Sequence, residues 1–378
     1  MELTDEQAAI RDAVREFAVE EIRPTEPAAD RAQTFPESVW DGLAELDLTG
    51  LTTPVEYGGF DADRLTYSVV NEAVAYGGLS VATALSVHCL ATSCIAQFGS
   101  DEQKDRWLPE MAATGRPVGA FALSEPHAGS NPAEMSTVAR RDGDEYVLDG
   151  QKQWITNGER SGVVIVFART DPDDPGSITQ FLVPKETEGL SVGEKESKLG
   201  LRASDTTPLT FDGVRIPAEN RLTEEGRGLA AALSILTGGR IGIASQAVGL
   251  AQAALDEAIE YAGEREQFDR PIGEFQTIRH KIADMQTNVQ ASRLLTRDAA
   301  AREDRGEDPT MAASMAKYFA SEAAVDVCNE AVQIHGGYGY VTEFDVERFY
   351  RDAKITTIYE GTSEIQKKVI ARELLGEP

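Results

Sequence analysis

The sequence predicts a mainly α-helical protein with an antiparallel β domain in the middle of the chain. Residues 1–115 and 223–378 place apolar residues at helical spacing, whereas residues 116–222 alternate short β-rich runs with turn dipeptides. With 378 residues the chain is long enough for two or three domains. We therefore expect a helical N-terminal domain (1–115), a β-barrel-like middle domain (116–222) and a C-terminal four-helix bundle (223–378).

The N-terminal zone begins with an amphipathic helix. Thr4 and Gln7 match a capping box at its start, and Pro24 and Pro27 are expected to end it. The last helix of the zone, residues 79–98, has no formally charged residue and is long enough to span a membrane. Its serines, threonines, histidine and glutamine are too polar for lipid, so we expect a buried core helix that stops at Gly99, with His88 as a core histidine.

The middle zone is marked by β-rich runs. Val163–Phe167 and Gln180–Val183 are the clearest, and Tyr146–Leu148 and Leu209–Phe211 are shorter candidates. Turn dipeptides such as Asn157-Gly158 separate them. No intervening segment is long enough to form the helix that a parallel crossover needs, so we expect an antiparallel sheet.

Long helices return in the C-terminal zone. An alanine-rich stretch over 228–263 precedes Pro271, and further helices are expected over 278–289, over 309–327 and over 365–375. Gly336 and Gly337 should break the helix that begins at Pro309. Long antiparallel helices joined in this way form a bundle.

Charge is the outlying property of the composition. Sixty-four acidic residues face 36 basic ones, which gives a formal net charge of −28. Such a surface repels nucleic acid and anionic membranes, so we expect neither as a partner. The acids are spread along the chain and form no tail. We interpret them as the surface of a cytoplasmic protein from a halophile, where salt screens self-repulsion.

Several kinds of chemistry are disfavoured by what the sequence lacks. Cys89, Cys94 and Cys328 are an odd and sparse set, which predicts neither a disulfide framework nor a zinc site. The chain has no Rossmann fingerprint, P-loop or Gly-x-Ser-x-Gly elbow. None of its four histidines follows a glutamate by three residues, as a di-iron bundle requires, so we expect no metal. Residues 1–20 are charged and lack a signal-peptide core.

Two segments at the start of the middle zone combine residues that could bind a ligand. In Phe121–Ser130 two hydroxyls flank a turn, which suits a polar heterocycle or a phosphate, although an ordinary turn would look the same. Gln151–Gly158 is a strand before an Asn-Gly turn. Its Trp154 and Thr156 should point to the same face and could flank a stacked ring; a half-buried tryptophan on a sheet is the alternative.

Three more segments lie in the C-terminal zone. Arg265–Pro271 ends the long helix with arginines that could grip pyrophosphate, or that simply favour the helix dipole. Gln333–Tyr340 has paired glycines that allow a ligand to approach the backbone, or that cap a helix. In Ile358–Ile365, Glu360 is either a first-turn charge or a catalytic base, and a base needs a closed apolar site that raises its pKa.

Together and in this order, the segments resemble the signatures of the acyl-CoA dehydrogenase family over essentially the whole chain. FALSEPHAGS, QKQWITNG, QIHGGYG and IYEGTSEIQ are each similar to a family signature, and the helical–β–helical zoning fits the family's fold. Gly239–Ala244 and Tyr350–Ile355 are most similar to the short-chain, butyryl-CoA branch. The resemblance implies an enzyme that binds FAD without a Rossmann fold.

The resemblance also implies which residues contact FAD. The isoalloxazine side would be lined by Phe121, Leu123, Ser124, Gly129 and Ser130, with Trp154 and Thr156 flanking the ring. The FAD of an adjacent subunit would be reached by Arg265, Phe268 and Gln276, and its adenine half by Gln333, Gly336 and Gly337. The site would be completed by Thr362 and Glu364. A cofactor shared between subunits implies a homo-oligomer, in this family usually a tetramer.

By the same resemblance, Glu360 removes the substrate's α-proton while a hydride leaves the β-carbon for the flavin, which yields a trans-2-enoyl-CoA. Some relatives carry the base at the position of Gly239, where glycine cannot serve. The implied substrate contacts are Ser86, Leu90, Ser130, Thr237, Arg240, Tyr359 and Gly361. Two positions depart from the family pattern, because Asn131 and Thr237 stand where aspartate is usual.

The implied partners are an acyl-CoA and an electron-transfer flavoprotein. Two alternatives stay open. An acyl-CoA oxidase would pass its electrons to oxygen, although oxidases are usually much longer. A homologue without FAD would act as a binding protein, against which the retained Glu360, Arg240 and flavin segments argue. The acyl chain length is not predicted, because one methylene in an apolar pocket is worth only about 1–3 kcal/mol.

Overall fold

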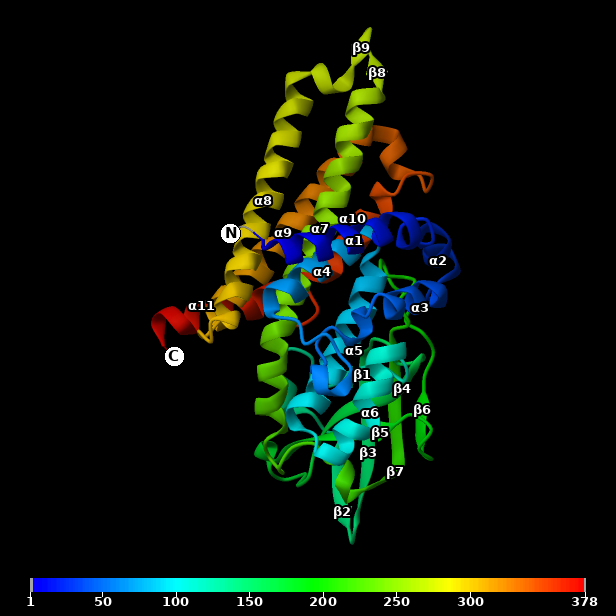
Figure 1. Ribbon diagram of the computed structural model, residues 1–378, viewed down its shortest axis with the longest axis vertical. Helices are drawn as coiled ribbons and strands as arrows, with labels where there is room; N and C mark the ends of the chain where they lie inside the picture. The colour runs from blue at the N-terminus through cyan, green and yellow to red at the C-terminus, as the bar shows by residue number, and fades with distance from the viewer. Residues whose placement is uncertain (1–2, 377–378) are drawn as a thin grey trace.

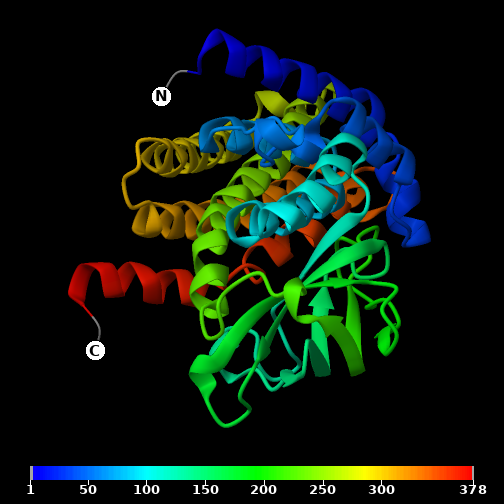
Figure 2. The same cartoon turned by 60° about the horizontal axis from the view of Figure 1, so that its bottom comes forward.

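The computed structural model describes residues 3–376. Helices from the two ends of the chain pack into one helical body, and the β domain lies at one end of it (Figures 1 and 2). The predicted order of helical, β and helical zones is therefore confirmed.

The N-terminal helices are α1 (Asp5–Phe17), α2 (Glu26–Ala32), α3 (Glu37–Glu45), α4 (Arg64–Gly77), α5 (Leu79–Phe98) and α6 (Asp101–Thr114). The predicted capping box is formed, since Thr4 Oγ1 accepts from the Gln7 N–H (3.1 Å) and Gln7 Oε1 accepts from the Thr4 N–H (3.2 Å). The expected helix end is only partly right. A π-helical turn extends α1 to Ile22, and Pro27 lies in the first turn of α2, where its missing N–H costs nothing.

Helix α5 is a core helix, as predicted. By length and composition α5 and α7 could each cross a membrane, but 89% and 67% of their most apolar windows are buried inside the protein. His88 of α5 is enclosed, with its ring nitrogens 3.2 Å from Met111 O and 3.0 Å from the Gly119 N. Helix α5 ends at Gly99 as expected.

The strands are β1 (Val118–Ala122), β2 (Val138–Asp142), β3 (Glu145–Ile155), β4 (Ser161–Arg169), β5 (Ile178–Pro184), β6 (Leu190–Val192) and β7 (Thr207–Pro217). They form one curled sheet in the order β1-β4-β2-β3-β7-β6, with β5 paired to β4. The expectation of an antiparallel sheet is wrong for β1 and β4, which run parallel. Their crossover is made by the β2–β3 hairpin, so no helix is needed.

The C-terminal zone contains α7 (Gly228–Glu264), the short strands β8 (Glu266–Gln267) and β9 (Arg270–Pro271), α8 (Gln276–Asp304), α9 (Thr310–His335), α10 (Val346–Thr356) and α11 (Ser363–Leu375). Helices α7, α8 and α9 form the long part of the bundle, and α11 projects from the body (Figure 2). Helix α10 was not predicted. It is short, and no side chain caps its start.

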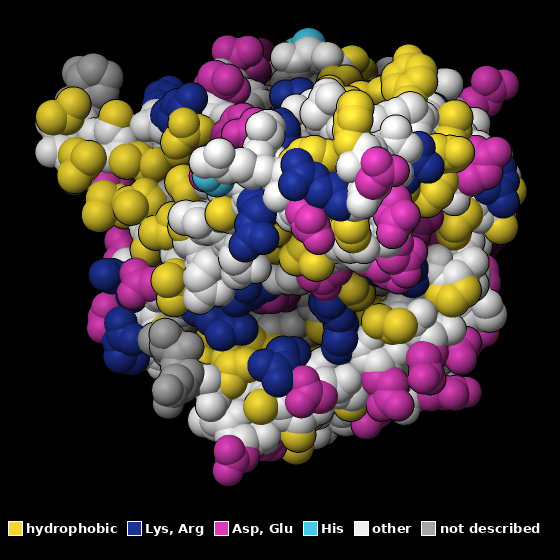
Figure 3. Space-filling model, turned by 90° about the horizontal axis from the view of Figure 1, so that it is seen from above, with side chains coloured by type: hydrophobic (Ala, Val, Ile, Leu, Met, Phe, Trp, Pro, Cys, Tyr) yellow, Lys and Arg dark blue, Asp and Glu magenta, His cyan; other side chains and the backbone are white. Residues whose placement is uncertain are grey.

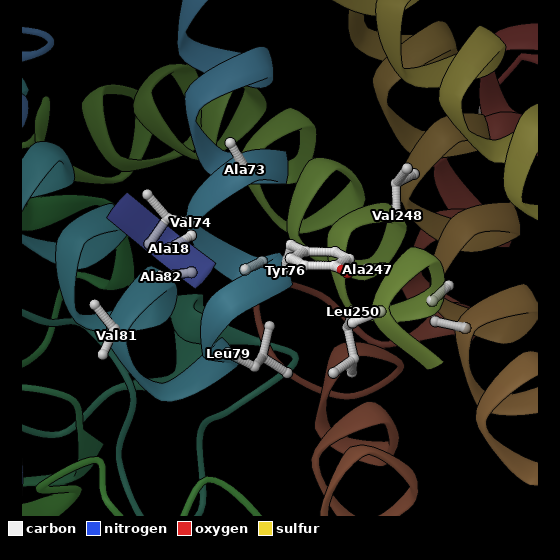
Figure 4. Packing of buried hydrophobic residues seen from close by; sticks show 14 of the residues in the cluster. Ala18, Ala73, Val74, Tyr76, Leu79, Val81, Ala82, Ala247, Val248 and Leu250 are labelled. Atoms are coloured by element: carbon white, nitrogen blue, oxygen red, sulfur yellow. The ribbon is translucent and has the colours of Figure 1, made fainter. Parts of the chain in front are cut away.

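The main core joins the first and last zones. Figure 4 shows α4 and α7 in one packed cluster of mostly small side chains, in which Tyr76 of α4 lies beside Ala247 of α7 and Val74 of α4 lies beside Ala18. Such small residues let the two helices approach closely, which fixes α7 against the N-terminal helices. Cys89, Cys94 and Cys328 are free thiols, and all three are buried. On the face drawn in Figure 3, acidic side chains are spread among basic ones and do not form a single block.

Candidate functional site

Glu360 lies in the turn between α10 and α11. The φ angle is 50° at Glu360 and 94° at Gly361, so both have left-handed backbone conformations. Such a conformation costs a non-glycine residue on the order of 1–3 kcal/mol and persists only where the surroundings hold it. Thr362 begins α11 by accepting the Ile365 N–H (3.3 Å), which fixes one side of the turn.

Two buried side chains hold the other side, and neither was predicted. Lys317 of α9 donates from Nζ to the Gly361 carbonyl oxygen (2.7 Å). Gln366 donates to the same oxygen (2.9 Å) and to the Glu360 carbonyl oxygen (3.4 Å). Lys317 is fully buried, and burial lowers its pKa to about 8. A lysine on the alanine-rich buried face of a predicted helix was the signal that could have found it.

The Glu360 carboxylate faces Gly239 of α7. A Cβ atom built on Gly239 would lie 2.3 Å from Glu360 Oε2, so this carboxylate uses the space that a side chain at residue 239 would fill. Oε2 is enclosed and has no hydrogen-bond partner within the part of the chain that the structure describes. Burial raises the pKa of Glu360 to about 7, although Lys317 and Arg240 act to lower it. An unpaired carboxylate that titrates near neutral pH has the properties of a general base.

Other predicted substrate residues surround this carboxylate. Arg240 is buried, and its Nε has no hydrogen-bond partner among the described residues. Burial lowers the pKa of Arg240, and the nearby charge of Glu360 acts to raise it. The Tyr359 hydroxyl lies 3.4 Å from both Thr83 Oγ1 and Gln246 Oε1. The Glu360 N–H has no hydrogen-bond acceptor in residues 3–376, so a donor is free beside the carboxylate. The turn therefore offers a base and a neighbouring hydrogen-bond donor.

A cavity of about 160 Å³ borders the site. Its wall includes Leu90 and Gly239, together with Thr52, Arg64, Tyr67, Cys89, Ser93, Gln97, Ser234, Ile235 and Glu303. Ser86 is not part of this wall but contacts it, since its Oγ lies 3.1 Å from the Tyr67 hydroxyl. The Thr237 hydroxyl donates to Leu233 O in its own helix (3.1 Å).

A buried ion pair joins the two segments predicted to face the flavin. Lys152 Nζ lies 2.8 Å from Glu125 Oε1 and donates to Leu123 O (3.2 Å), and both charged side chains are fully enclosed. The Glu125 carboxylate also accepts the N–H groups of Ser136 (2.6 Å) and Thr137 (3.0 Å). Burial alone would raise the pKa of Glu125, but Lys152 and these hydrogen bonds lower it to about 2. Sequence reasoning missed this pair.

The exposed part of the flavin segments forms a ledge on the β domain. The Gln153 N–H donates to Ser124 O (2.9 Å), and Trp154 is 53% exposed. Trp154 has a φ of 58° and causes a bulge in β3, so the strand alternation behind the same-face prediction for Trp154 and Thr156 is broken. A Cβ built on Gly129 would meet only Trp154, at 3.8 Å.

The remaining residues of these segments differ in exposure. Gly129 and Ser130 are exposed, Ser124, Phe121 and Thr156 are half-buried, and Leu123 is buried. An exposed indole beside open backbone and hydroxyls is a surface on which a planar ring can stack. The residues present therefore fit an isoalloxazine ring.

The third predicted group lies at the opposite end of the long axis, around the β8–β9 tip (Figure 1). A cavity of about 740 Å³ there is lined in part by Arg265, Gly336 and Gly337. Phe268 is 86% exposed, and Gln276 and Gln333 are exposed as well. Within one chain this group is separated from Trp154 and its neighbours. Thr362 and Glu364 lie beside Glu360 at the start of α11.

Nearly the whole chain is similar to known proteins. Three domain profiles, described as the N-terminal, middle and C-terminal domains of acyl-CoA dehydrogenase, match residues 4–115, 120–214 and 226–375. The chain belongs to the acyl-CoA dehydrogenase family. It is therefore an oxidoreductase of the kind that dehydrogenates acyl-CoA thioesters with FAD.

Individual members are similar over nearly their full lengths. The mitochondrial short-chain specific acyl-CoA dehydrogenase of Rattus norvegicus is 45% identical over 99% of this chain and 91% of its own. Butyryl-CoA dehydrogenase of Megasphaera elsdenii has a TM-score of 0.96, with 40% identity and 99% of both chains covered. A chain reported with the electron transferring flavoprotein of Acidaminococcus fermentans has a TM-score of 0.97, with 39% identity and 100% of both covered. A glutaryl-CoA dehydrogenase from Mycobacterium smegmatis, in complex with FADH2, has a TM-score of 0.94, with 33% identity and coverage of 99% of this chain and 96% of its own.

Proposed function

We propose that this acyl-CoA dehydrogenase oxidises short acyl-CoA thioesters to trans-2-enoyl-CoA, with Glu360 as the base for the α-proton. The enclosed and unpaired Oε2 of Glu360 is the observation that carries the proposal. The similarity to the short-chain and butyryl-CoA enzymes supports the substrate class.

In this mechanism the acyl chain lies along the cavity beside Gly239, which brings the α-carbon to Glu360. The carboxylate takes the α-proton, and a pKa near 7 lets it accept the proton without being permanently protonated. The free Glu360 N–H donates to the thioester carbonyl, where negative charge develops. Arg240 and Lys317 stabilise the carboxylate form of Glu360 and so keep it ready to act.

We assign FAD to the ledge formed by Phe121, Leu123, Ser124, Gly129, Ser130, Trp154 and Thr156, with Thr362 and Glu364 beside it. FAD held by these residues would supply the hydride acceptor for the substrate's β-carbon. The ion pair between Lys152 and Glu125 holds the loop that follows β1 against β3, and so holds the two segments of the ledge together. Ser130, Tyr359, Gly361 and Thr237 are assigned to the CoA thioester.

We further propose a homotetramer in a salt-rich cytoplasm. The residues around the β8–β9 tip lie at the opposite end of the molecule from the β domain that carries the ledge (Figure 1), so they would serve the FAD of a second copy. They are Arg265, Phe268, Gln276, Gln333, Gly336 and Gly337. An electron-transfer flavoprotein is the proposed electron acceptor, supported by the similarity to a chain studied with such a protein.

The test is a visible spectrum of the purified protein in high salt, without oxygen, before and after butyryl-CoA is added. We expect a flavin band that bleaches on addition. Glu360→Gln should keep the fold and the flavin band but slow bleaching by several orders of magnitude, because the amide cannot take the proton. Near-normal bleaching in that variant would remove Glu360 from its role.

The same preparation separates the two alternatives. Oxygen consumption at the rate of substrate oxidation would identify an oxidase. A protein without a flavin band, even after incubation with FAD, would be the non-catalytic binding protein.

A further inference from the structure

Three glycines on α7 leave their side-chain space to residues from other elements. They are Gly238, Gly239 and Gly242. Cβ atoms built at these positions would come within 2.3–2.8 Å of the polar ends of, in order, Arg64, Glu360 and Tyr67. Glu360 therefore packs against the same glycine-containing stretch of α7 as Arg64 and Tyr67, two residues that the proposed reaction does not use.

The Tyr67 side chain is buried, and its hydroxyl has a hydrogen-bond partner. It is 2% exposed, and its hydroxyl lies 3.1 Å from Ser86 Oγ. Gly242, against which the phenol packs, is three residues along α7 from Gly239, which is a rise of about 4.5 Å, a little less than one helical turn. Both Tyr67 and Gly239 line the 160 Å³ cavity. The phenol is thus a wall of that cavity about one turn away from the base.

An ion pair lies next to the phenol. The Arg64 guanidinium lies 2.7 Å from Glu303 Oε1 and 5.0 Å from the centre of the Tyr67 ring. Among the described residues 3–376, Glu303 Oε2 is enclosed and has no hydrogen-bond partner. Arg64 and Glu303 also line the cavity beside Tyr67, so an alkyl chain that reached this part of the wall would take water away from the two charges and offer no hydrogen bond in return, which is unfavourable.

The cavity volume agrees with a short occupant. A water molecule takes up about 30 Å³ of liquid, so 160 Å³ holds on the order of five groups of that size. A chain of about four carbons attached to a thioester is of this size.

We propose that Tyr67, held by Ser86 and flanked by the Arg64–Glu303 ion pair, is the end wall of the acyl pocket and restricts the enzyme to straight chains of about four carbons. The inference rests on the proposed function, since it assumes that the acyl chain leaves Glu360 along Gly239 and Leu90. Tyr67 is in this view a specificity-determining residue and takes no part in proton transfer.

The experiment measures kcat/KM for butyryl-, hexanoyl-, octanoyl- and dodecanoyl-CoA with an artificial electron acceptor, using flavin-loaded protein. The variant is Tyr67→Leu. Tyr76→Leu is the matched control, because Tyr76 is a buried tyrosine of the same helix that does not line the cavity (Figure 4). One methylene in a pocket of the right shape changes kcat/KM by about 10–200-fold.

We expect the wild type to prefer butyryl-CoA, and Tyr67→Leu to raise the octanoyl-to-butyryl ratio of kcat/KM by at least about tenfold. The ratio should stay constant in Tyr76→Leu. An unchanged ratio in flavin-loaded Tyr67→Leu overturns the inference. So does a wild type that oxidises dodecanoyl-CoA as readily as butyryl-CoA, a result that needs no variant to fold. If flavin-loaded wild type oxidises none of the four, the proposed function fails, and the inference fails with it.

Discussion

Replacing Gly239 with alanine should displace the carboxylate of Glu360, the proposed base, without unfolding the protein. The added methyl group would lie 2.3 Å from Glu360 Oε2, whereas ordinary van der Waals contact begins at 3.4 Å, so the carboxylate must move by about 1 Å. Leu90 Cδ2 lies 3.5 Å from the same position, which leaves the methyl group little room to move away. Helix α7 itself gains about 0.5–1 kcal/mol, because alanine is favoured over glycine inside a helix.

The size of the effect follows from that displacement. A shift of about 1 Å at a reacting group costs on the order of 10²-fold in rate. This corresponds to about 2.7 kcal/mol of transition-state free energy. The KM for butyryl-CoA should change much less, because the substrate contacts made by the Glu360 backbone and the cavity wall remain.

The assay is anaerobic stopped-flow reduction of the bound flavin by butyryl-CoA. Gly263→Ala is the matched control, since residue 263 lies in the same helix and a Cβ there meets nothing within 4 Å. We expect the control to react at the full rate with an equal or slightly higher Tm. Flavin-loaded Gly239→Ala that is reduced within about twofold of the wild-type rate would refute the reasoning.

Four further predictions follow from the site and the surface. Turnover should rise with pH through the neutral range, because the proposed base Glu360 must be deprotonated to act and burial raises its pKa to about 7; a rate that is flat between about pH 5 and 9 contradicts this. Lys317→Met should move that rise to higher pH, since Lys317 lowers the pKa of Glu360, and Lys317→Arg should keep it near the wild-type midpoint; the pH–rate profiles of both variants decide it. Lys152→Met should lower stability by about 3–5 kcal/mol and reduce the flavin retained after gel filtration, because Glu125 becomes a buried charge without its partner; a stable variant with full flavin content argues against the ledge role. Transfer from molar to millimolar salt should lower the Tm, because a net charge of −28 is then unscreened, and a Tm that does not respond to salt argues against a halophilic origin.

Local signals were enough to predict where many elements begin and end. The capping box at Thr4, the stop at Gly99 and the helix start after Pro309 are all short-range features, and the structure confirms them. The parallel pairing of β1 and β4 is different. It depends on which strands meet after the β2–β3 hairpin has crossed between them, and no local pattern reports that.

The candidate site divides in the same way. Resemblance located Glu360 and its neighbours in the chain, and the structure brings Glu360, Gly239, Arg240 and Tyr359 into one place. The supporting residues could not be predicted, because their roles depend on contacts between distant elements. Lys317 lies on another helix from the turn that it binds, and the bulge at Trp154 breaks the alternation from which its direction was expected.

The hydrogen bond from Lys317 to the Gly361 carbonyl makes the position of Glu360 depend on the packing of the helical body. The turn that carries Glu360 has an unfavourable backbone conformation, and one of the groups that hold it belongs to α9, which packs against α7, α8, α10 and α11. Slight loosening of α9 on heating would release the turn while nearly all helices are still formed. Heat inactivation should therefore precede the loss of helical circular dichroism, so the enzyme would stop working before it melts.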